Sequence, residues 1–150
     1  MKTIIYSIVL AITCTLFIAG CGQTAPGGAD PTVKETVIRI ARQEYQRCIS
    51  RMIYIRLARM LPNYDLTYDN LKLNSSSDAN AKKAVAAIDA VMAKTNMALT
   101  NIRTDRIDEK IKKSYSSADL IINNDKLPIT YTAQRNAEGK VYVEVYGLKF

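Results

Sequence analysis

The hydrophobic and polar positions in the first half of the chain, after residue 31, follow a helical pattern. Over residues 32–61, apolar residues recur every three or four positions, which predicts one long helix. Thr32 and Glu35 have the spacing of a capping box at its start, and Pro62 is expected to end it. The apolar stripe that we expect this helix to bury consists of Val37, Ala41, Tyr45, Cys48, Met52 and Ile55.

A second helix is predicted over residues 79–94, after a polar connection over residues 63–78. Asp78 stands where a helix cap is expected. The segment is rich in alanine, which suggests close packing against the first helix. Its expected apolar side consists of Val85, Ile88, Val91 and Met92.

Strand patterns dominate the last third of the chain. Residues 97–108 fit either a continued helix or a strand, and their threonines favour the strand. Strands are then predicted over residues 114–122, 129–134 and 140–147, with turns between them and with the valines of the last strand facing the helices. The prediction is an α+β fold: two N-terminal helices, then a three- or four-stranded antiparallel meander, in one small domain over residues 32–150.

The first 21 residues have a different pattern. Lys2 precedes an apolar run that is shorter than the roughly 20 residues of a spanning helix, and Ala19, Gly20 and Cys21 follow it. This arrangement resembles the signal of bacterial lipoproteins. The resemblance implies cleavage between Gly20 and Cys21, with diacylglycerol and an N-acyl chain on Cys21 and no other cofactor. The alternative is an uncleaved membrane helix over residues 3–19.

The resemblance also implies a location. Gly22 stands where many lipoproteins retained at the inner membrane carry Asp, so we expect a lipid anchor in the outer membrane, on its periplasmic face. Residues 21–31 are then the lipidated cysteine and a flexible tether, because glycine, proline and small residues dominate them.

Charge suggests one candidate surface and aromatic residues suggest another. The chain carries 21 Lys and Arg against 14 Asp and Glu. Seven of these cations and two acids lie within residues 33–61, a local net charge of 7 − 2 = +5. The arginines off the apolar stripe form either a solvated back of the helix or a surface that contacts a protein partner or anionic lipid; they are Arg39, Arg42, Arg47 and Arg51. On the predicted sheet, Tyr131, Tyr142 and Tyr146 form either a recognition face or ordinary cross-strand pairs. Nucleic acid is a poor partner for an envelope protein.

The sequence offers little for catalysis. Histidine is absent, and Cys48 would be the lone thiol of the processed chain, expected to be buried as a small hydrophobe. The pairs Asp65 with Asp69 and Asp105 with Glu109 lack the spacing of a calcium loop, so no metal site is predicted. A Ser-Lys dyad is conceivable from the group Ser114, Ser116, Ser117, Lys112 and Lys113, but no apolar pocket for the lysine is evident.

Residues 101–148 contain the pattern N-I-R-T, I-D, K-K, A-D-L, P-I-T-Y-T-A-Q and G-K-V-Y-V-E-V-Y-G-L. This pattern is similar to a small module of uncharacterised bacterial lipoproteins and membrane-anchored proteins. That module often has a cysteine on its first or second strand, where this chain has Ser116 and Ser117. It has no assigned catalytic residues, so the resemblance implies a fold only.

These observations lead to one main hypothesis: a non-catalytic, outer-membrane-anchored lipoprotein that docks another envelope protein or complex. A protective lipoprotein (immunity, entry exclusion or inhibition) and a carrier of a lipid or other small ligand are the alternatives. A small hydrolase would require the serine and lysine group to assemble.

Overall fold

A computed structural model of the chain describes residues 24–59, 62 and 64–150. The predicted signal peptide, with Gly20 and Cys21, lies outside these residues. Three helices precede a four-stranded antiparallel sheet in the described part, which confirms the α+β class. The helices are α2 (Pro31–Ala58), α3 (Tyr68–Asn74) and α4 (Ala79–Lys94), and the strands are β1 (Met97–Asp108), β2 (Lys113–Ile122), β3 (Asp125–Arg135) and β4 (Val141–Tyr146). The helices are therefore one long and two short, and not the two that were predicted.

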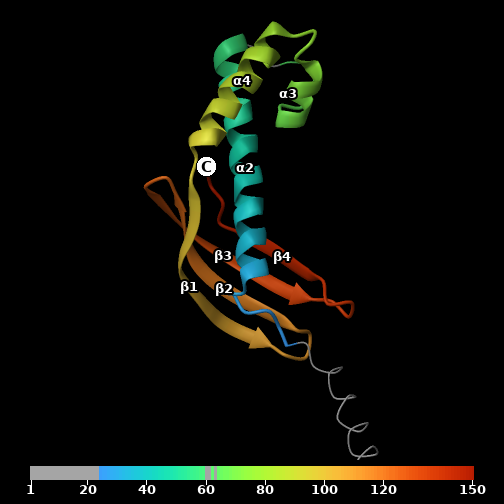
Figure 1. Cartoon of the computed structure of the whole chain (residues 1–150), viewed down its shortest axis with the longest axis vertical. Coiled ribbons are helices and arrows are strands. Elements are labelled where there is room, and N and C mark those ends of the chain that lie inside the picture. Colours follow the sequence, from blue (N-terminus) through green and yellow to red (C-terminus); the bar gives the residue numbers. More distant parts are fainter. Residues whose placement is uncertain (1–23, 60–61, 63) are drawn as a thin grey trace, which may run out of the picture.

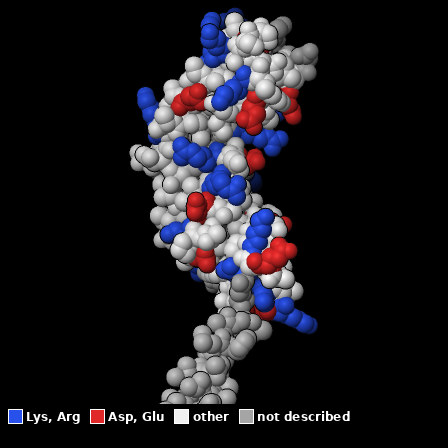
Figure 2. All heavy atoms as spheres, turned by 45° about the vertical axis from the view of Figure 1, so that its right-hand side comes forward, with Lys and Arg blue, Asp and Glu red and all other residues white. Residues whose placement is uncertain are grey.

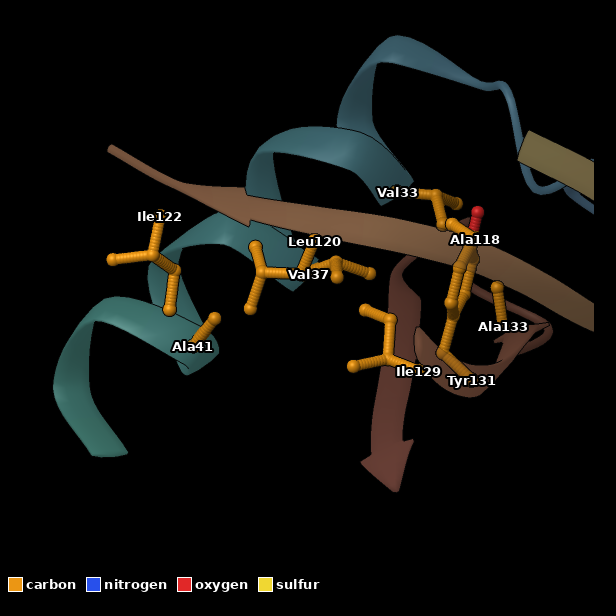
Figure 3. Packing of buried hydrophobic residues seen from close by; sticks show 9 residues of the cluster. All are labelled: Val33, Val37, Ala41, Ala118, Leu120, Ile122, Ile129, Tyr131 and Ala133. Carbon is orange, nitrogen blue, oxygen red and sulfur yellow. The ribbon is translucent and has the colours of Figure 1, made fainter. Parts of the chain in front are cut away.

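The long helix α2 connects two separate cores (Figure 1). Its first half packs on one face of the sheet, and its second half packs against α3 and α4. The core between α2 and the sheet is called the lower core. In it, Val33, Val37 and Ala41 of α2 lie against residues of β2 and β3 (Figure 3). Tyr45 packs against both cores and joins them. No helix among the described residues has the length and apolar character needed to cross a membrane.

The start of α2 differs from the predicted capping box. Asp30 is the cap, and its Oδ1 accepts from the backbone N–H of Thr32 at 2.8 Å and of Val33 at 3.4 Å. Pro31 occupies the first turn, where its missing N–H costs nothing. The helix ends at Ala58, and Arg59 follows in the left-handed conformation at φ 58°. The predicted end near residue 61 is therefore three residues too late.

The predicted apolar stripe of α2 is buried only in part. Val37 and Ala41 are fully buried, but Cys48 is half-buried, and Met52 and Ile55 are 54% and 38% exposed. The reason is that the sheet contacts one face of the helix and α4 contacts another. Further along the helix the buried residues are Ile49, Ser50 and Tyr54, which lie around the axis from the predicted stripe.

The short helix α3 was not predicted, because its seven residues are too few to show a helical period. The bounds of α4 match the prediction, and the Asp78 side chain caps it by accepting from Asn80 N and Ala81 N. Ala81 and Ala84 are fully buried, which confirms the close helix packing expected from small residues.

The sheet resolves the ambiguity of residues 97–108, which form strand β1. A bulge between Thr100 and Arg103, with Asn101 at φ 51°, shifts the alternation by one residue. Because of this bulge Met97, Leu99 and Ile102 all pack against the core. The valines of β4 also pack against that core, as predicted.

Strand β3 begins earlier than predicted and contains Pro128 within its length instead of at its start. Strand β4 pairs only with Thr130 to Arg135, so Pro128 has a neighbouring strand on one side, β2, and none on the other. Proline is tolerated at such an edge position because it has no N–H to donate to a second strand.

Residues 25–30, which we call the N-terminal strap, are packed on the sheet. Ala25, Pro26 and Gly28 are buried. Four hydrogen bonds fix the strap: Ala25 N to Glu109 Oε2 at 3.5 Å, Gly28 N to Thr104 Oγ1 at 3.0 Å, Ser114 Oγ to Pro26 O at 2.5 Å and Tyr131 Oη to Gly28 O at 2.9 Å. The prediction of a flexible tether up to residue 31 is therefore wrong for the strap, and the domain begins near Ala25.

Candidate docking surface

The exposed part of the α2 stripe forms an open groove with the C-terminal tail, residues 147–150, which follows β4. Cys48, Met52 and Ile55 lie beyond the area that the sheet covers, and Leu148 and Phe150 of the tail lie opposite them. The ring of Phe150 meets the ring of Tyr45 edge to face at 5.4 Å, which holds the tail beside the helix. We call this surface the α2–tail groove; its lining residues are Glu44, Arg47, Cys48, Arg51, Met52, Ile55, Leu148 and Phe150.

The groove combines exposed apolar side chains with Leu148, which also packs against the core between α2 and the sheet. Met52 is 54% exposed and Phe150 is 40% exposed, and both belong to one continuous surface. Single exposed apolar residues are ordinary, but a contiguous group with a polar edge is typical of an interaction site. Methionine suits such a site because its flexible thioether adapts to different partners.

Two of the four predicted arginines lie at this groove. Arg47 Nη1 lies 3.8 Å from Glu44 Oε2, and because this ion pair is exposed it contributes little to stability. Arg51 has no ion pair with any described residue. Basic and acidic side chains are interspersed along the side of the molecule seen in Figure 2.

The other two arginines have different positions. Arg42 donates to the backbone oxygen of Met92 at 2.9 Å and to that of Thr95 at 3.5 Å, at the C-terminal end of α4. A cation there satisfies free carbonyls and interacts favourably with the helix dipole. Arg39 is exposed and does not line the groove. The predicted arginine surface therefore divides into a groove edge, a helix cap and one solvent-exposed residue.

The three predicted tyrosines do not form one surface. Tyr131 is 1% exposed and lies in the lower core, where burial raises the pKa of its hydroxyl. Tyr142 and Tyr146 lie on the opposite face of the sheet and are about half exposed. Tyr146 donates to Glu144, which also accepts from Thr132 and Lys113. These hydrogen bonds, that of Tyr146 first, lower the pKa of Glu144.

The serine and lysine group does not assemble into a dyad. Ser114 and Ser116 point into the core, while Lys113 lies on the other face of β2 beside Glu144. Ser117 shares the face of Lys113 but is four residues away, which is about 13 Å along a strand. The buried Ser116 hydroxyl has no hydrogen-bond partner within the described residues.

The carboxylates of the predicted pair Asp105 and Glu109 have separate roles. Asp105 pairs with Arg103, which lowers the pKa of Asp105, and Glu109 accepts from the strap. No group of three or more possible metal-ligating side chains occurs in the part of the chain that the structure describes.

A polar cluster lies between α2 and α4, away from the groove. The Asp78 carboxylate accepts from the hydroxyls of Tyr54 at 2.7 Å and Tyr64 at 2.9 Å. The hydrogen bond from Tyr54 is the largest influence that lowers the pKa of Asp78, and partial burial opposes it. The pKa of Tyr54 is raised by the same bond, and that of Tyr64 is raised by burial first.

Sequence reasoning assigned Cys48, Met52 and Ile55 to the core and did not consider Leu148 or Phe150. The sequence signal that could have indicated an exposed surface is the length of the apolar stripe of α2, because a short sheet cannot cover all of it. No protein family, curated protein or solved structure matches the chain in comparisons with known proteins.

Proposed function

We propose that this chain is a non-catalytic lipoprotein that is anchored in the outer membrane through Cys21 and docks another envelope protein in the α2–tail groove. The observation that carries the proposal is the continuation of the α2 stripe beyond the sheet, as an apolar surface edged by Arg47 and Arg51. The lipoprotein signal supports the anchor.

The spacing of the groove residues favours a helical partner. Cys48, Met52 and Ile55 are separated by four and three positions, so they form one ridge along α2. A second helix can pack along such a ridge with its own apolar stripe. The arginines at the edge favour acidic side chains on that helix, because opposite charges improve both the encounter rate and the selectivity.

The position of the groove favours a protein over lipid head groups as its occupant. Positions 48 to 55 lie about 25 to 35 Å along the helix axis from Pro31, at a rise of 1.5 Å per residue. The strap that leads toward Cys21 lies at the other end of α2 (Figure 1). The groove is therefore presented well away from the anchored end.

A charge-reversal pair tests the docking surface. Arg51→Glu changes the groove edge, and Arg39→Glu makes the same charge change on an exposed residue outside the groove. Tagged proteins are purified from solubilised envelopes, and co-purified proteins are quantified by mass spectrometry. We expect Arg51→Glu to reduce recovery of a specific partner about tenfold, equal to ~1.4 kcal/mol, and Arg39→Glu to leave it unchanged. Equal recovery by both variants would contradict the assigned surface.

The anchor is tested separately. Metabolic palmitate labelling should mark the wild-type protein and should disappear in Cys21→Ser. Labelling that persists in Cys21→Ser, or that is absent from the wild type, would remove the anchor from the proposal.

A further inference from the structure

The two hairpin turns β1–β2 and β3–β4 lie at the same end of the sheet, beside the N-terminal strap (Figure 1). They are joined by hydrogen bonds from Gln134 Nε2 to Ile111 O at 3.1 Å and from Arg135 N to Lys112 O at 3.2 Å. Ala25 of the strap donates to Glu109 in the first turn. We call this part of the molecule the strap end.

The strap end exposes apolar and basic side chains. Ile111 in the first turn is 46% exposed and Ile107, on the core face of the sheet, is 48% exposed. Tyr142, on the opposite face at the start of β4, is 54% exposed. Exposed basic side chains in the two turns are Lys110 and Lys140, with Lys112 partly exposed. Large apolar side chains with lysine beside them, and tyrosine with its amphipathic ring, are residues that proteins place at the boundary between lipid and water.

The acidic side chains of the first turn have partners inside the protein. Asp108 Oδ1 accepts from Lys110 N at 3.1 Å and from Ile111 N at 3.3 Å, which closes the turn. Glu109 accepts from the strap. Residues 106–113 and 136–140 together carry five cations and three acids, a local charge of 5 − 3 = +2, which complements an anionic lipid surface. One of these cations, Lys113, is paired with Glu144.

The length of chain before the strap limits how far this end can lie from an anchored Cys21. Only Gly22, Gln23 and Thr24 separate Cys21 from Ala25, so the two Cα atoms are at most about 14 Å apart. The polar layer on each side of a bilayer is about 5 to 7 Å thick. A lipidated Cys21 therefore keeps the strap end close to the lipid head groups, whereas α3 lies toward the other end of α2.

We propose that the strap end is a second membrane contact, in which Ile111 enters the interface of an anionic phospholipid bilayer and the neighbouring lysines bind its head groups. This inference rests on the lipid anchor of the proposed function. It adds an orientation to that function, because membrane contact at the strap end directs α2 and its groove away from the bilayer.

The test measures lipid contact at two exposed apolar positions of the acylated full-length protein. A Cys48→Ser background leaves no thiol in the described residues. Ile111→Cys places a nitrobenzoxadiazole label at the strap end, and Leu73→Cys places the same label on α3, where the native side chain is 77% exposed. Lys110→Cys gives a second strap-end position. The proteins are reconstituted into vesicles of three parts phosphatidylethanolamine to one part phosphatidylglycerol, with and without brominated lipid.

We expect brominated lipid to quench the label at 111 and at 110 several-fold more than the label at 73, with a blue-shifted emission at 111. Quenching at 111 and 110 that does not exceed quenching at 73 overturns the contact. Intact mass and vesicle flotation are recorded on the same samples. A protein that floats and carries acyl chains but shows no difference in quenching keeps its anchor and loses only the strap-end contact. A protein without acyl chains refutes the anchor itself.

Discussion

The strap gives the most specific stability prediction, because Gly28 lies where no side chain fits. A Cβ atom built at Gly28 would lie 2.4 Å from Ser116 Oγ, 2.7 Å from Ser116 Cβ and 3.0 Å from Tyr131 Oη. Ordinary contacts begin near 3.4 Å, so Gly28→Ala requires the strap or strand β2 to move by about 1 Å. The adjacent Gly27 has no atom within 4 Å of its built Cβ, which makes Gly27→Ala a matched control.

The expected decrease in the free energy of unfolding follows from the hydrogen bonds that the displacement of the strap would break. The Gly28 carbonyl accepts from Tyr131, the Gly28 amide donates to Thr104, and Pro26 O accepts from Ser114. Each of these hydrogen bonds contributes about 1 kcal/mol, and the buried Tyr131 hydroxyl would be left unpaired. The free energy of unfolding should therefore fall by about 2 to 4 kcal/mol. The urea midpoint should then fall by about 1 to 2 M at a slope of about 2 kcal/mol/M, the middle of the range for small domains.

Urea unfolding followed by far-UV circular dichroism measures this difference in the detergent-solubilised protein. Gly27→Ala should unfold within about 0.5 kcal/mol of the wild type, as surface substitutions usually do. If Gly28→Ala unfolds at the same urea concentration as Gly27→Ala, the strap is not packed on the sheet. The limit on the distance between Cys21 and the domain would then be lost as well.

Two further predictions concern the helices. The Asp78 pKa is lowered in the folded protein, so its stabilising contribution is complete above pH about 4 and is lost as the pH falls through the lowered value. Asp78→Asn, which keeps a capping oxygen, should make urea stability less sensitive to acid; unchanged acid sensitivity would show that the carboxylate has no such role. Arg42→Gln should lower stability by about 0.5 to 1 kcal/mol through loss of the α4 cap, and Arg39→Gln should not; equal midpoints for the two variants would exclude the capping role.

Local periodicity was sufficient for much of the fold. Strand β4 alternates valines that pack on the core with exposed tyrosine and glutamate side chains, so its pattern is visible in the sequence without knowledge of its neighbours. The cap and bounds of α4 were also readable, because Asp78 and the alanine-rich segment act within one helix. Residues 97–108 remained ambiguous because the bulge at Asn101 breaks the period of two.

The strap was mistaken for a tether because its order comes from residues distant in sequence. Gly28 and Tyr131 are separated by 103 positions, and Ala25 and Glu109 by 84. Glycine, proline and alanine are typical of flexible linkers, but they are also the residues that lie flat on a sheet without steric conflict. Composition alone does not distinguish these two situations.

The candidate site was missed for a related reason. The apolar stripe of α2 predicts which face of the helix is hydrophobic, but not which elements cover it. The sheet covers that face only as far as Ala41 and Tyr45, and α4 packs on a different face further along. The exposure of Met52 is therefore a property of the tertiary arrangement.

Site-specific photo-crosslinking in intact cells tests whether the α2–tail groove is the docking surface. A photoreactive benzoyl-phenylalanine replaces Met52 in the groove or, as the control, Leu73 on α3, which is also exposed and apolar. We expect a discrete adduct with one envelope protein from position 52, lost on adding Arg51→Glu and absent from position 73. No discrete adduct from position 52, or the same adduct from both positions, would contradict the assignment of the α2–tail groove as the docking surface.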